Sequence, residues 1–176
     1  MAGLGALLLS LLLNFFSTMA HPKEEQTLIL IKPDAIQRSL LGEIIGRFER
    51  KGLRIVGMKM IQLEDALLEA HYAHIKDKPF FVGIKGFMKS APVVAMVLSG
   101  INAVAATRLI VGPTKAYEAD AGSIRGDLSL SIQSNVVHSS DSIETAGEEV
   151  KRFFKDEELF DYQKADFAYV YADEAF

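Results

Sequence analysis

The chain has 176 residues, of which 49% are hydrophobic and 24% are charged, and its formal net charge is −4. This length allows one domain with a hydrophobic core, and the composition is typical of a globular protein rather than of a disordered chain or a protein with many membrane spans. A negative net charge provides no overall positive field for nucleic acid. The sequence has no cysteine, which excludes disulfides, thiolate catalysis and cysteine metal sites, and its four histidines argue against a multi-histidine zinc centre.

The N-terminal segment is apolar and carries no charged side chain before Lys23. Its apolar run at 6–16 has about the length of a signal-peptide core and is too short for a membrane-spanning helix. We favour translation from Met19, which predicts a cytoplasmic protein. A signal peptide or an anchor formed by residues 1–20 would instead make the protein secreted or membrane-anchored. We therefore separate an apolar segment and linker at 1–25 from a domain at 26–176.

Up to residue 110, apolar periodicity and turn residues predict short strands alternating with helices. TLILI at 27–31 is typical of a strand, and Pro33 ends it. The segment 39–51 repeats apolar residues at helical spacing, and Gly52 is the expected stop. The same patterns then predict a strand at 53–63, a helix at 65–75, a short helix or turn at 80–90, a strand at 93–98 and a helix at 101–110.

Residues 112–130 differ, because they contain glycine, proline and several charges with little periodicity. A loop this long inside a compact domain is usually functional. After it we predict a strand at 132–137, a helix that Asp141 and Glu144 cap, and an edge strand or packed tail at 167–171. This order of elements predicts an α/β or α+β fold with one mixed sheet.

No standard phosphate-binding loop is present, since the sequence has neither G-x-x-x-x-G-K-[ST] nor G-x-G-x-x-G. Bound phosphates would therefore need isolated cations and the end of a helix. Five polar residues are candidates: Lys32, Arg108, Thr114, Arg125 and Asn135. Each also has a structural interpretation, because such cations can be surface charges or helix caps and the other two can belong to turns.

The segment NVVHSSDS at 135–142 places His138 between a predicted strand and a predicted helix. The free N–H groups and positive dipole of a helix start favour phosphate. A neutral imidazole there could attack phosphorus with one nitrogen while an acceptor holds the other. Glu149 is a candidate acceptor, because it follows Ser142 by seven residues, about two helical turns. A phosphohistidine, a histidine general base and a half-buried structural histidine all stay open, and Glu149 can also be a solvated charge.

NVVHSSDS resembles the active-site motif of the nucleoside diphosphate kinase family, N-x-x-H-G-S-D-S. Further blocks stand in that family's order and spacing: TLILIKPDA, HYAHIKDKPFF, PVVAMVLSG, NAVAATRLIVGPT, SIRGD and FFKDEELFDY. The resemblance extends over residues 26–171. Because several ordered blocks contain the five phosphate-binding candidates and His138, the resemblance is far more specific than one short motif.

The resemblance implies a nucleoside diphosphate kinase that transfers the terminal phosphate of a nucleoside triphosphate (ATP) to a nucleoside diphosphate. The reaction would be ping-pong through a phosphohistidine on His138, with Mg²⁺ held mainly by the nucleotide phosphates and by no protein ligand. Glu149 would orient the imidazole, and Ser140 would support it. The other implied sites are Tyr72 near the histidine, Lys32 and Asn135 at the sugar hydroxyl and phosphate end, Phe80 and Ile132 on either side of the base, Arg108, Thr114 and Arg125 on the phosphates, and Asp141 near the metal or as a helix cap.

The implied fold is a ferredoxin-like α/β (α+β) sandwich, with a four-stranded antiparallel sheet covered by helices. The expected partners are nucleoside di- and triphosphates and further copies of the chain in a homotetramer or homohexamer. No nucleic acid is expected as a partner. Binding to a membrane is expected only if the N-terminal segment is retained.

Three departures from the family pattern stand out. Ser139 replaces the usual Gly or Ala, Ala35 replaces a common Gly, and Lys115-Ala116 replaces Asn-Pro. A serine beside the nucleophile requires a negative φ there. A nucleotide-binding regulatory or scaffolding subunit without turnover is the alternative function, although no expected catalytic residue is missing.

Overall fold

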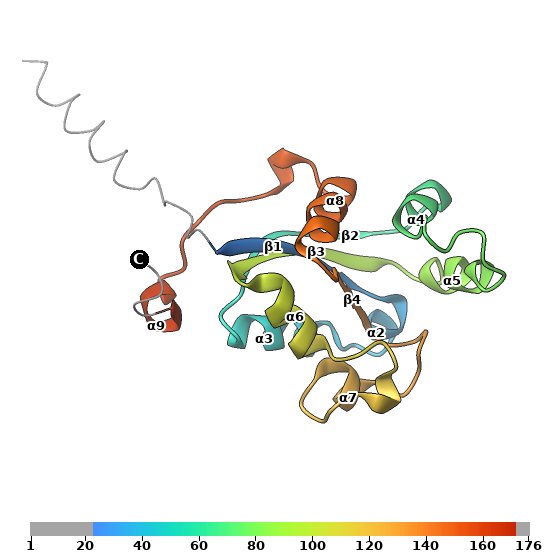
Figure 1. Cartoon of the computed structure of the whole chain (residues 1–176), viewed down its shortest axis with the longest axis horizontal. Coiled ribbons are helices and arrows are strands. Elements are labelled where there is room, and N and C mark those ends of the chain that lie inside the picture. The colour runs from blue at the N-terminus through green and yellow to red at the C-terminus, as the bar shows by residue number, and fades with distance from the viewer. Residues whose placement is uncertain (1–22, 172–176) are drawn as a thin grey trace, which may run out of the picture. The chain divides into compact units, whose positions relative to one another are not determined.

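The computed structural model describes residues 23–171, which belong to two units (Figure 1). One unit is Lys23–Phe160. The described part of the other contains the helix α9 (Phe167–Tyr171), whose two terminal rings have centroids 4.8 Å apart. The edge strand predicted at 167–171 is therefore wrong, because aromatic residues four apart meet on one face of a helix. No helix within residues 23–171 is long and apolar enough to cross a membrane. Almost all of the predicted segment 1–25 lies outside the described residues.

A four-stranded antiparallel sheet forms the centre of the unit Lys23–Phe160, with strand order β2-β3-β1-β4. Its strands are β1 (Glu24–Ile31), β2 (Arg54–Ile61), β3 (Val93–Ile101) and β4 (Val137–Ser139). The central strand β1 pairs with β3 on one side and with β4 on the other, where Leu30 lies opposite His138. The implied four-stranded antiparallel sheet is confirmed, and the mixed sheet expected from element order is wrong.

Helices cover both faces of this sheet (Figure 1). One face packs on α2 (Pro33–Gln37), α3 (Leu41–Arg50), α6 (Ala103–Val111) and α7 (Ile124–Leu128) through Ile29 and Ile31 of β1. The other face packs on α4 (Asp65–His71), α5 (Phe81–Met88) and α8 (Ile143–Phe153) through Leu28 and Leu30. Since both faces are covered, β3 is buried along nearly its whole length instead of alternating between apolar and polar residues.

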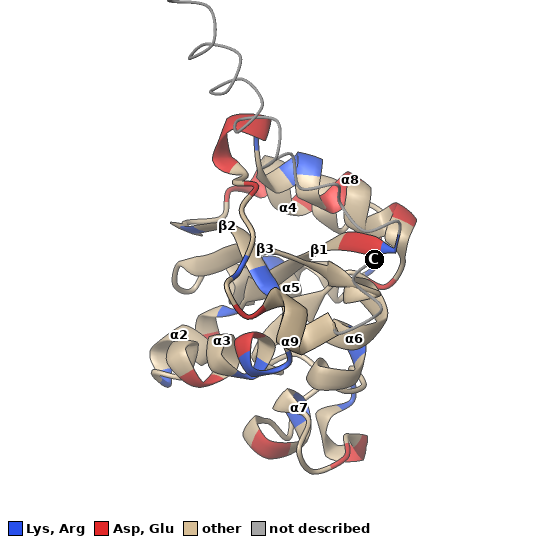
Figure 2. Cartoon of the chain, turned by 90° about the vertical axis from the view of Figure 1, so that its left-hand side faces the viewer, with Lys and Arg blue, Asp and Glu red and all other residues tan. Residues whose placement is uncertain are grey.

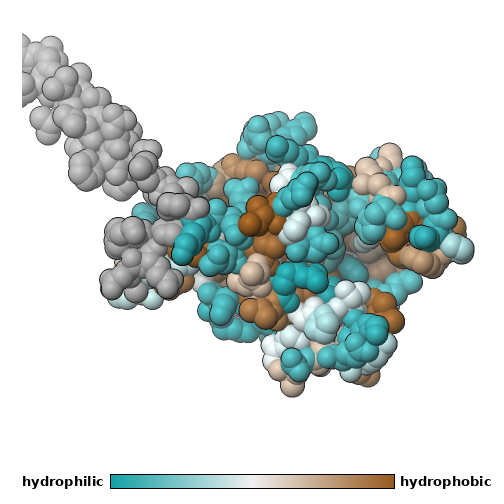
Figure 3. All heavy atoms as spheres, viewed as in Figure 1, coloured by the Kyte–Doolittle hydropathy of each residue, from teal (hydrophilic) through white to brown (hydrophobic). Residues whose placement is uncertain are grey.

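The face of this unit seen in Figure 3 is largely polar, and the unit carries both signs of charge (Figure 2). Hydrophilic side chains dominate the face seen in Figure 3, with hydrophobic ones scattered among them. Acidic and basic residues are mixed along α3 and α8 (Figure 2), as in the Glu43–Arg47 pair at 2.8 Å. Near the end of the unit, η2 (Asp156–Glu158) is joined to β2 by the Lys59–Glu158 pair at 2.7 Å.

Two helix boundaries differ from the sequence prediction, and both lie near the site. Helix α4 ends at His71 because Tyr72 leaves the helical conformation, so turns over 72–80 connect it to α5. Helix α8 begins after Ser142, whose Oγ accepts a hydrogen bond from the Thr145 N–H at 3.0 Å. The cap predicted at Asp141 is therefore wrong, because Ser142 already accepts a free N–H of the first turn.

The predicted loop at 112–130 is partly helical, since it contains η1 (Ala116–Glu118) as well as α7. Ser123 connects its parts: its Oγ donates to the Asp120 carbonyl at 2.6 Å and accepts from the Gly126 N–H at 3.1 Å. A Cβ on Gly126 would overlap the Asp120 carbonyl oxygen. This close backbone approach shapes the loop that carries Arg125 into the site.

Substituting Gly126→Ala is expected to destabilise the protein by about 1–3 kcal/mol, because the added methyl group forces the backbone of the loop apart. The matched control is Gly42→Ala in α3, where a Cβ would meet nothing within 4 Å. That control should be neutral or stabilising by up to about 1 kcal/mol, because alanine favours a helix over glycine. Urea unfolding at equilibrium compares the two, and equal midpoints would show that the loop tolerates the methyl group.

Candidate active site

A cavity of about 1040 Å³ lies where the end of β1, the 72–80 turns, α6, the 112–130 loop, the start of β4 and α8 meet. The site residues predicted from the sequence line it, except Ser140, which is fully buried behind Glu149. The lining ones are Lys32, Tyr72, Phe80, Arg108, Thr114, Arg125, Ile132, Asn135, His138, Asp141 and Glu149. Residues distant in sequence are thus brought together around one space of the size that ligands occupy.

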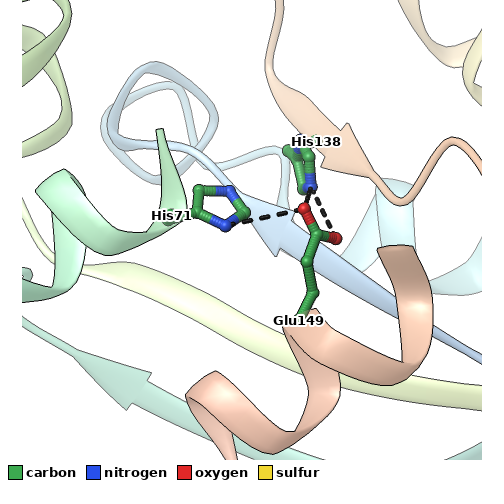
Figure 4. A group of neighbouring side chains, drawn as sticks. All are labelled: His71, His138 and Glu149. Atoms are coloured by element: carbon green, nitrogen blue, oxygen red, sulfur yellow. Dashed lines mark hydrogen bonds and ion pairs between the residues drawn. The ribbon is translucent and has the colours of Figure 1, made fainter. Parts of the chain in front are cut away.

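The centre of the cavity is a hydrogen bond between His138 on β4 and Glu149 on α8 (Figure 4). His138 Nε2 lies 3.1 Å from both carboxylate oxygens. Ser140 Oγ donates to Glu149 Oε2 at 2.6 Å and accepts from the Leu28 N–H at 3.2 Å. Because an ionised carboxylate only accepts, the proton of the neutral imidazole belongs on Nε2 and the lone pair on Nδ1.

Glu149 stays ionised although it is buried. Burial alone raises the pKa of this carboxyl, but the hydrogen bond from His138, the positive charge of the His138 ring when it is protonated, and the hydrogen bond from the Ser140 hydroxyl lower it further than burial raises it. Its net pKa therefore lies below its ordinary value. At neutral pH a buried negative charge thus faces the Nε2 side of the His138 ring.

His71 completes this cluster, and the sequence analysis gave it no role. It is the last residue of α4, and its ring stands edge-on to that of His138, with centroids 4.8 Å apart. Its Nδ1 lies 3.5 Å from Glu149 Oε1 (Figure 4). Burial, followed by the nearby charge of His138, lowers the pKa of His71 to about 3, so the imidazole is neutral. The signal that could have found it is its place three residues after Leu68, on the buried stripe of α4.

The segment before His138 is not the strand predicted at 132–137, because a strained turn interrupts it. Val136 has a φ of 61°, a left-handed conformation that costs about 1–2 kcal/mol for a residue with a Cβ and is rare for a β-branched one. The Val136 N–H donates to Asp34 Oδ2 at 3.0 Å, and its carbonyl accepts from the Lys32 N–H at 2.9 Å. Asp34, which the sequence analysis did not single out, thereby holds the turn that starts β4.

Asn135 and Arg125 connect this turn to the 112–130 loop. Asn135 Nδ2 donates to the Thr114 carbonyl at 3.0 Å, and its Oδ1 accepts from Lys32 Nζ at 2.5 Å. The Arg125 guanidinium is buried and donates to the carbonyls of Val137 at 2.7 Å and Gly112 at 2.8 Å. Both side chains therefore shape the cavity as well as line it.

Three of the cations that line the cavity, Lys32, Arg108 and Arg125, form no ion pair with a carboxylate among residues 23–171. Burial and then the charge of Arg125 lower the pKa of Lys32 to about 8. Burial and then the charge of Arg108 lower the pKa of Arg125 to about 10, so it remains cationic at neutral pH. Like charges that depress one another's pKa indicate a site prepared for an anion.

Apolar and polar groups complete the walls. Phe80 and Ile132 line the cavity with 57% and 51% of their surfaces exposed, which leaves both free to contact a planar ligand. Burial and then the charge of Glu149 raise the pKa of Tyr72 to about 12, so its hydroxyl keeps its proton. Asp141 is exposed at the cavity. Ser139 is buried and has no left-handed φ, so the serine fits the backbone as required.

Comparison with known proteins agrees with this site. The family model "Nucleoside diphosphate kinase" matches residues 25–159. The chain is 50% identical over 152 residues to the nucleoside diphosphate kinase of Parabacteroides distasonis, covering 86% of this chain and 99% of that protein. It is 46% identical over 153 residues to nucleoside diphosphate kinase B of Bos taurus, covering 87% and 99%.

The fold is also similar to the folds of solved structures. A halophilic nucleoside diphosphate kinase from Halobacterium salinarum in complex with CDP matches with a TM-score of 0.82 and 41% identity, over 84% of this chain and 99% of that chain. These similarities define an enzyme of the phosphotransferase class. The chain belongs to the nucleoside diphosphate kinase family.

Removing the carboxylate that holds the Val136 turn is expected to destabilise the protein. Asp34→Ala leaves the Val136 N–H without its acceptor and should cost about 1–3 kcal/mol. Asp34→Asn is the matched control, because its amide oxygen can still accept that bond, and it should retain most of the stability. Urea unfolding measures both, and an Asp34→Ala midpoint equal to that of the unsubstituted chain would contradict the assignment.

Proposed function

We propose that the chain transfers the terminal phosphate of a nucleoside triphosphate such as ATP to a nucleoside diphosphate, through a phosphohistidine on His138. The observation that carries the proposal is the buried Glu149 carboxylate at His138 Nε2, within a cavity whose lining includes Lys32, Arg108 and Arg125. This bond leaves Nδ1 with the lone pair. The family membership of the chain supports the same reaction.

In the first half-reaction, Nδ1 of His138 attacks the terminal phosphorus, a P–N bond forms, and the bond to the bridging oxygen of the nucleoside diphosphate breaks. The imidazole becomes positively charged as the bond forms, and the ionised Glu149 opposite Nε2–H stabilises that charge. The second half-reaction is the reverse, with a different nucleoside diphosphate as acceptor. No water takes part, so the phosphate passes only between nucleotides.

The other cavity residues bind the nucleotide and spread charge in the transition state. Arg108, Arg125 and the Thr114 hydroxyl are assigned to the phosphates, where positioning and electrostatic stabilisation provide most of the catalysis of phosphoryl transfer. Lys32 and Asn135, already bonded to each other, are assigned to the sugar hydroxyl and adjoining phosphate. Tyr72, neutral and half-buried beside His71, is assigned to packing near the nucleophile.

The base is assigned to Phe80 and Ile132, the exposed apolar side chains of the cavity. Stacking recognises the face of a base and not its hydrogen-bonding edge, so we expect little selectivity among bases. The CDP in the Halobacterium salinarum structure is a pyrimidine ligand of a related protein.

Mg²⁺ fits this cavity as an ion held mainly by phosphates. Of the carboxylates that line it, Glu149 is bonded to His138 and Ser140, and Glu148 pairs with Arg152 at 3.8 Å. Asp141 makes no ion pair with any residue between 23 and 171, so it is the carboxylate that can support the ion, directly or through water. When bound, the ion neutralises phosphate charge and orients the phosphates.

A homotetramer or homohexamer is part of the proposal. Its support is the edge strand β2, on which Met58 and Met60 are 55% and 57% exposed. Exposed apolar side chains on an edge strand favour association with another chain. A cytoplasmic location stays a prediction that depends on residues 1–22, and so does the expectation that nucleic acid is not a partner.

The direct test is to incubate the protein with γ-labelled ATP and Mg²⁺, remove free nucleotide, and determine whether the retained label is acid-labile and base-stable. Adding GDP should then release the label as GTP. His138→Ala should take up no label, while His74→Ala, which removes another imidazole from the cavity wall, should still take it up. Glu149→Gln should slow labelling by roughly 10²-fold or more, because the charge opposite Nε2–H is lost.

A protein that binds ATP and takes up no label would contradict the kinase and favour the regulatory subunit. Ser139→Gly would then show whether the hydroxyl beside the nucleophile prevents transfer, since glycine or alanine is usual there in the family.

The pH dependence of nucleotide binding should report Lys32. Its pKa in the free protein is about 8, and the cation is the form that binds an anionic ligand, so the KM for nucleotide should rise as the pH increases through 8. The measurement is KM between pH 6.5 and about 9.5, where we expect an increase of roughly tenfold per pH unit above the pKa. Lys32→Arg should bind the nucleotide more weakly, but its KM should not change over this pH range, because arginine keeps its charge. An unchanged rise in that variant would assign the titration to another group.

A further inference from the structure

His71 is a buried polar group that the proposed reaction does not use. Its side chain is 2% exposed, and neither ring nitrogen has a hydrogen-bond partner within residues 23–171. Leaving such a group unpaired costs free energy, and few buried polar side chains in proteins are unpaired. Its Nδ1 points toward Glu149 Oε1 at 3.5 Å, so the imidazole is aimed at a carboxylate and not at solvent (Figure 4).

The ligand atoms of His71, His138 and Glu149 all lie within 4.8 Å of one another. His138 Nε2 is 3.1 Å from the carboxylate oxygens, and His71 Nδ1 is 3.5 Å from Oε1. In a tetrahedral zinc site the ligand atoms are about 3.3 Å apart, because the bonds to the metal are about 2.0–2.1 Å long. Two of the three separations are therefore close to those of a metal site before any side chain moves.

We propose that His71, His138 and Glu149 form a binding site for Zn²⁺ or a similar divalent transition metal ion, and that its occupation stops phosphoryl transfer. Two histidines and one glutamate are a known ligand set for zinc. Mg²⁺ prefers oxygen ligands alone, so this site is distinct from the proposed magnesium position on the phosphates. The inhibitory part rests on the proposed function, whereas the binding part does not.

The surroundings allow a cation to enter and stay. All three ligands line the cavity, so an ion can reach them from solvent and keep water in its remaining position. Glu149 supplies a negative charge, and Ser140 holds its Oε2, which leaves Oε1 facing both imidazoles. Arg152, a cation that also lines the cavity, is paired with Glu148 at 3.8 Å.

Metal binding would inhibit transfer through the tautomer of His138. A neutral imidazole has one proton and one lone pair, and the hydrogen bond to Glu149 holds the proton on Nε2. When a metal takes the lone pair at Nε2, the proton moves through solvent to Nδ1. Nδ1 then has no lone pair with which to attack phosphorus, so the histidine cannot be phosphorylated.

Binding is tested on the full chain without nucleotide or phosphate, using Co²⁺ as an optical substitute for zinc. We expect one Co²⁺ per chain with the visible absorption of four-coordinate cobalt, and its displacement by one equivalent of Zn²⁺. His71→Phe and Glu149→Gln should each lower the affinity for Co²⁺ at least tenfold. Using two variants keeps the test valid if one of them fails to fold. The matched control is His74→Phe, which removes an exposed imidazole of the same cavity and should bind as the unsubstituted chain does.

Inhibition is tested by loading the protein with Zn²⁺, removing the excess ion, and then adding γ-labelled ATP with Mg²⁺. Labelling of His138 should fall at least tenfold and return after EDTA treatment. The metal site would be refuted by the lack of a four-coordinate cobalt spectrum, or by affinities in both variants equal to that of the unsubstituted chain. Normal labelling of zinc-loaded protein would refute the inhibition. Failure of metal-free protein to take up label would refute the proposed function instead, whatever the cobalt spectrum shows.

Discussion

The site depends on one buried carboxylate. Glu149 is 4% exposed, and an ionised group so buried must be matched by donors. Those donors are His138 Nε2 and the Ser140 hydroxyl, two residues apart across the end of β4. Because Ser140 also accepts from the Leu28 N–H, the interaction joins α8, β4 and β1. The same bond that satisfies the charge determines which histidine nitrogen carries the proton.

A strand of three residues carries this histidine, so its position depends on groups outside the sheet. The Asp34 carboxylate holds the left-handed Val136 at the start of β4, and the Arg125 guanidinium donates to the Val137 carbonyl. The Arg125 position depends in turn on the close approach of Gly126 to Asp120. Phosphate-binding candidates and structural supports are thus partly the same side chains, which explains why Arg125 had both a functional and a structural interpretation in the sequence.

Patterns of local origin were predictable from the sequence. The apolar runs in β1 and β3 and the stripe of α3 follow from burial. His138, Glu149 and the five phosphate-binding candidates were named from their chemistry and position, whereas Tyr72, Phe80 and Ile132 were named only because the motif blocks resemble one family. What could not be predicted depends on tertiary contacts. The sequence pattern predicts a strand at Val136, but the structure has a turn there. Asp34, 102 residues away, accepts a hydrogen bond from the Val136 N–H. Asp141 fits the sequence pattern of a helix cap, but in the structure the cap of α8 is Ser142. His71 looked like one of four separate histidines, and only packing of α4 against α8 brings it to Glu149.

The central claim is that Glu149 keeps the proton of His138 on Nε2 and leaves Nδ1 as the nucleophile. The most direct measurement is ¹⁵N NMR of histidine-labelled protein at neutral pH, with His138 assigned by substitution and Glu149→Gln for comparison. We predict that the neutral form of the His138 ring carries its proton on Nε2, and that after reaction with ATP the phosphate is on Nδ1. A His138 ring that carries its proton on Nδ1, or a phosphate on Nε2, would contradict the account.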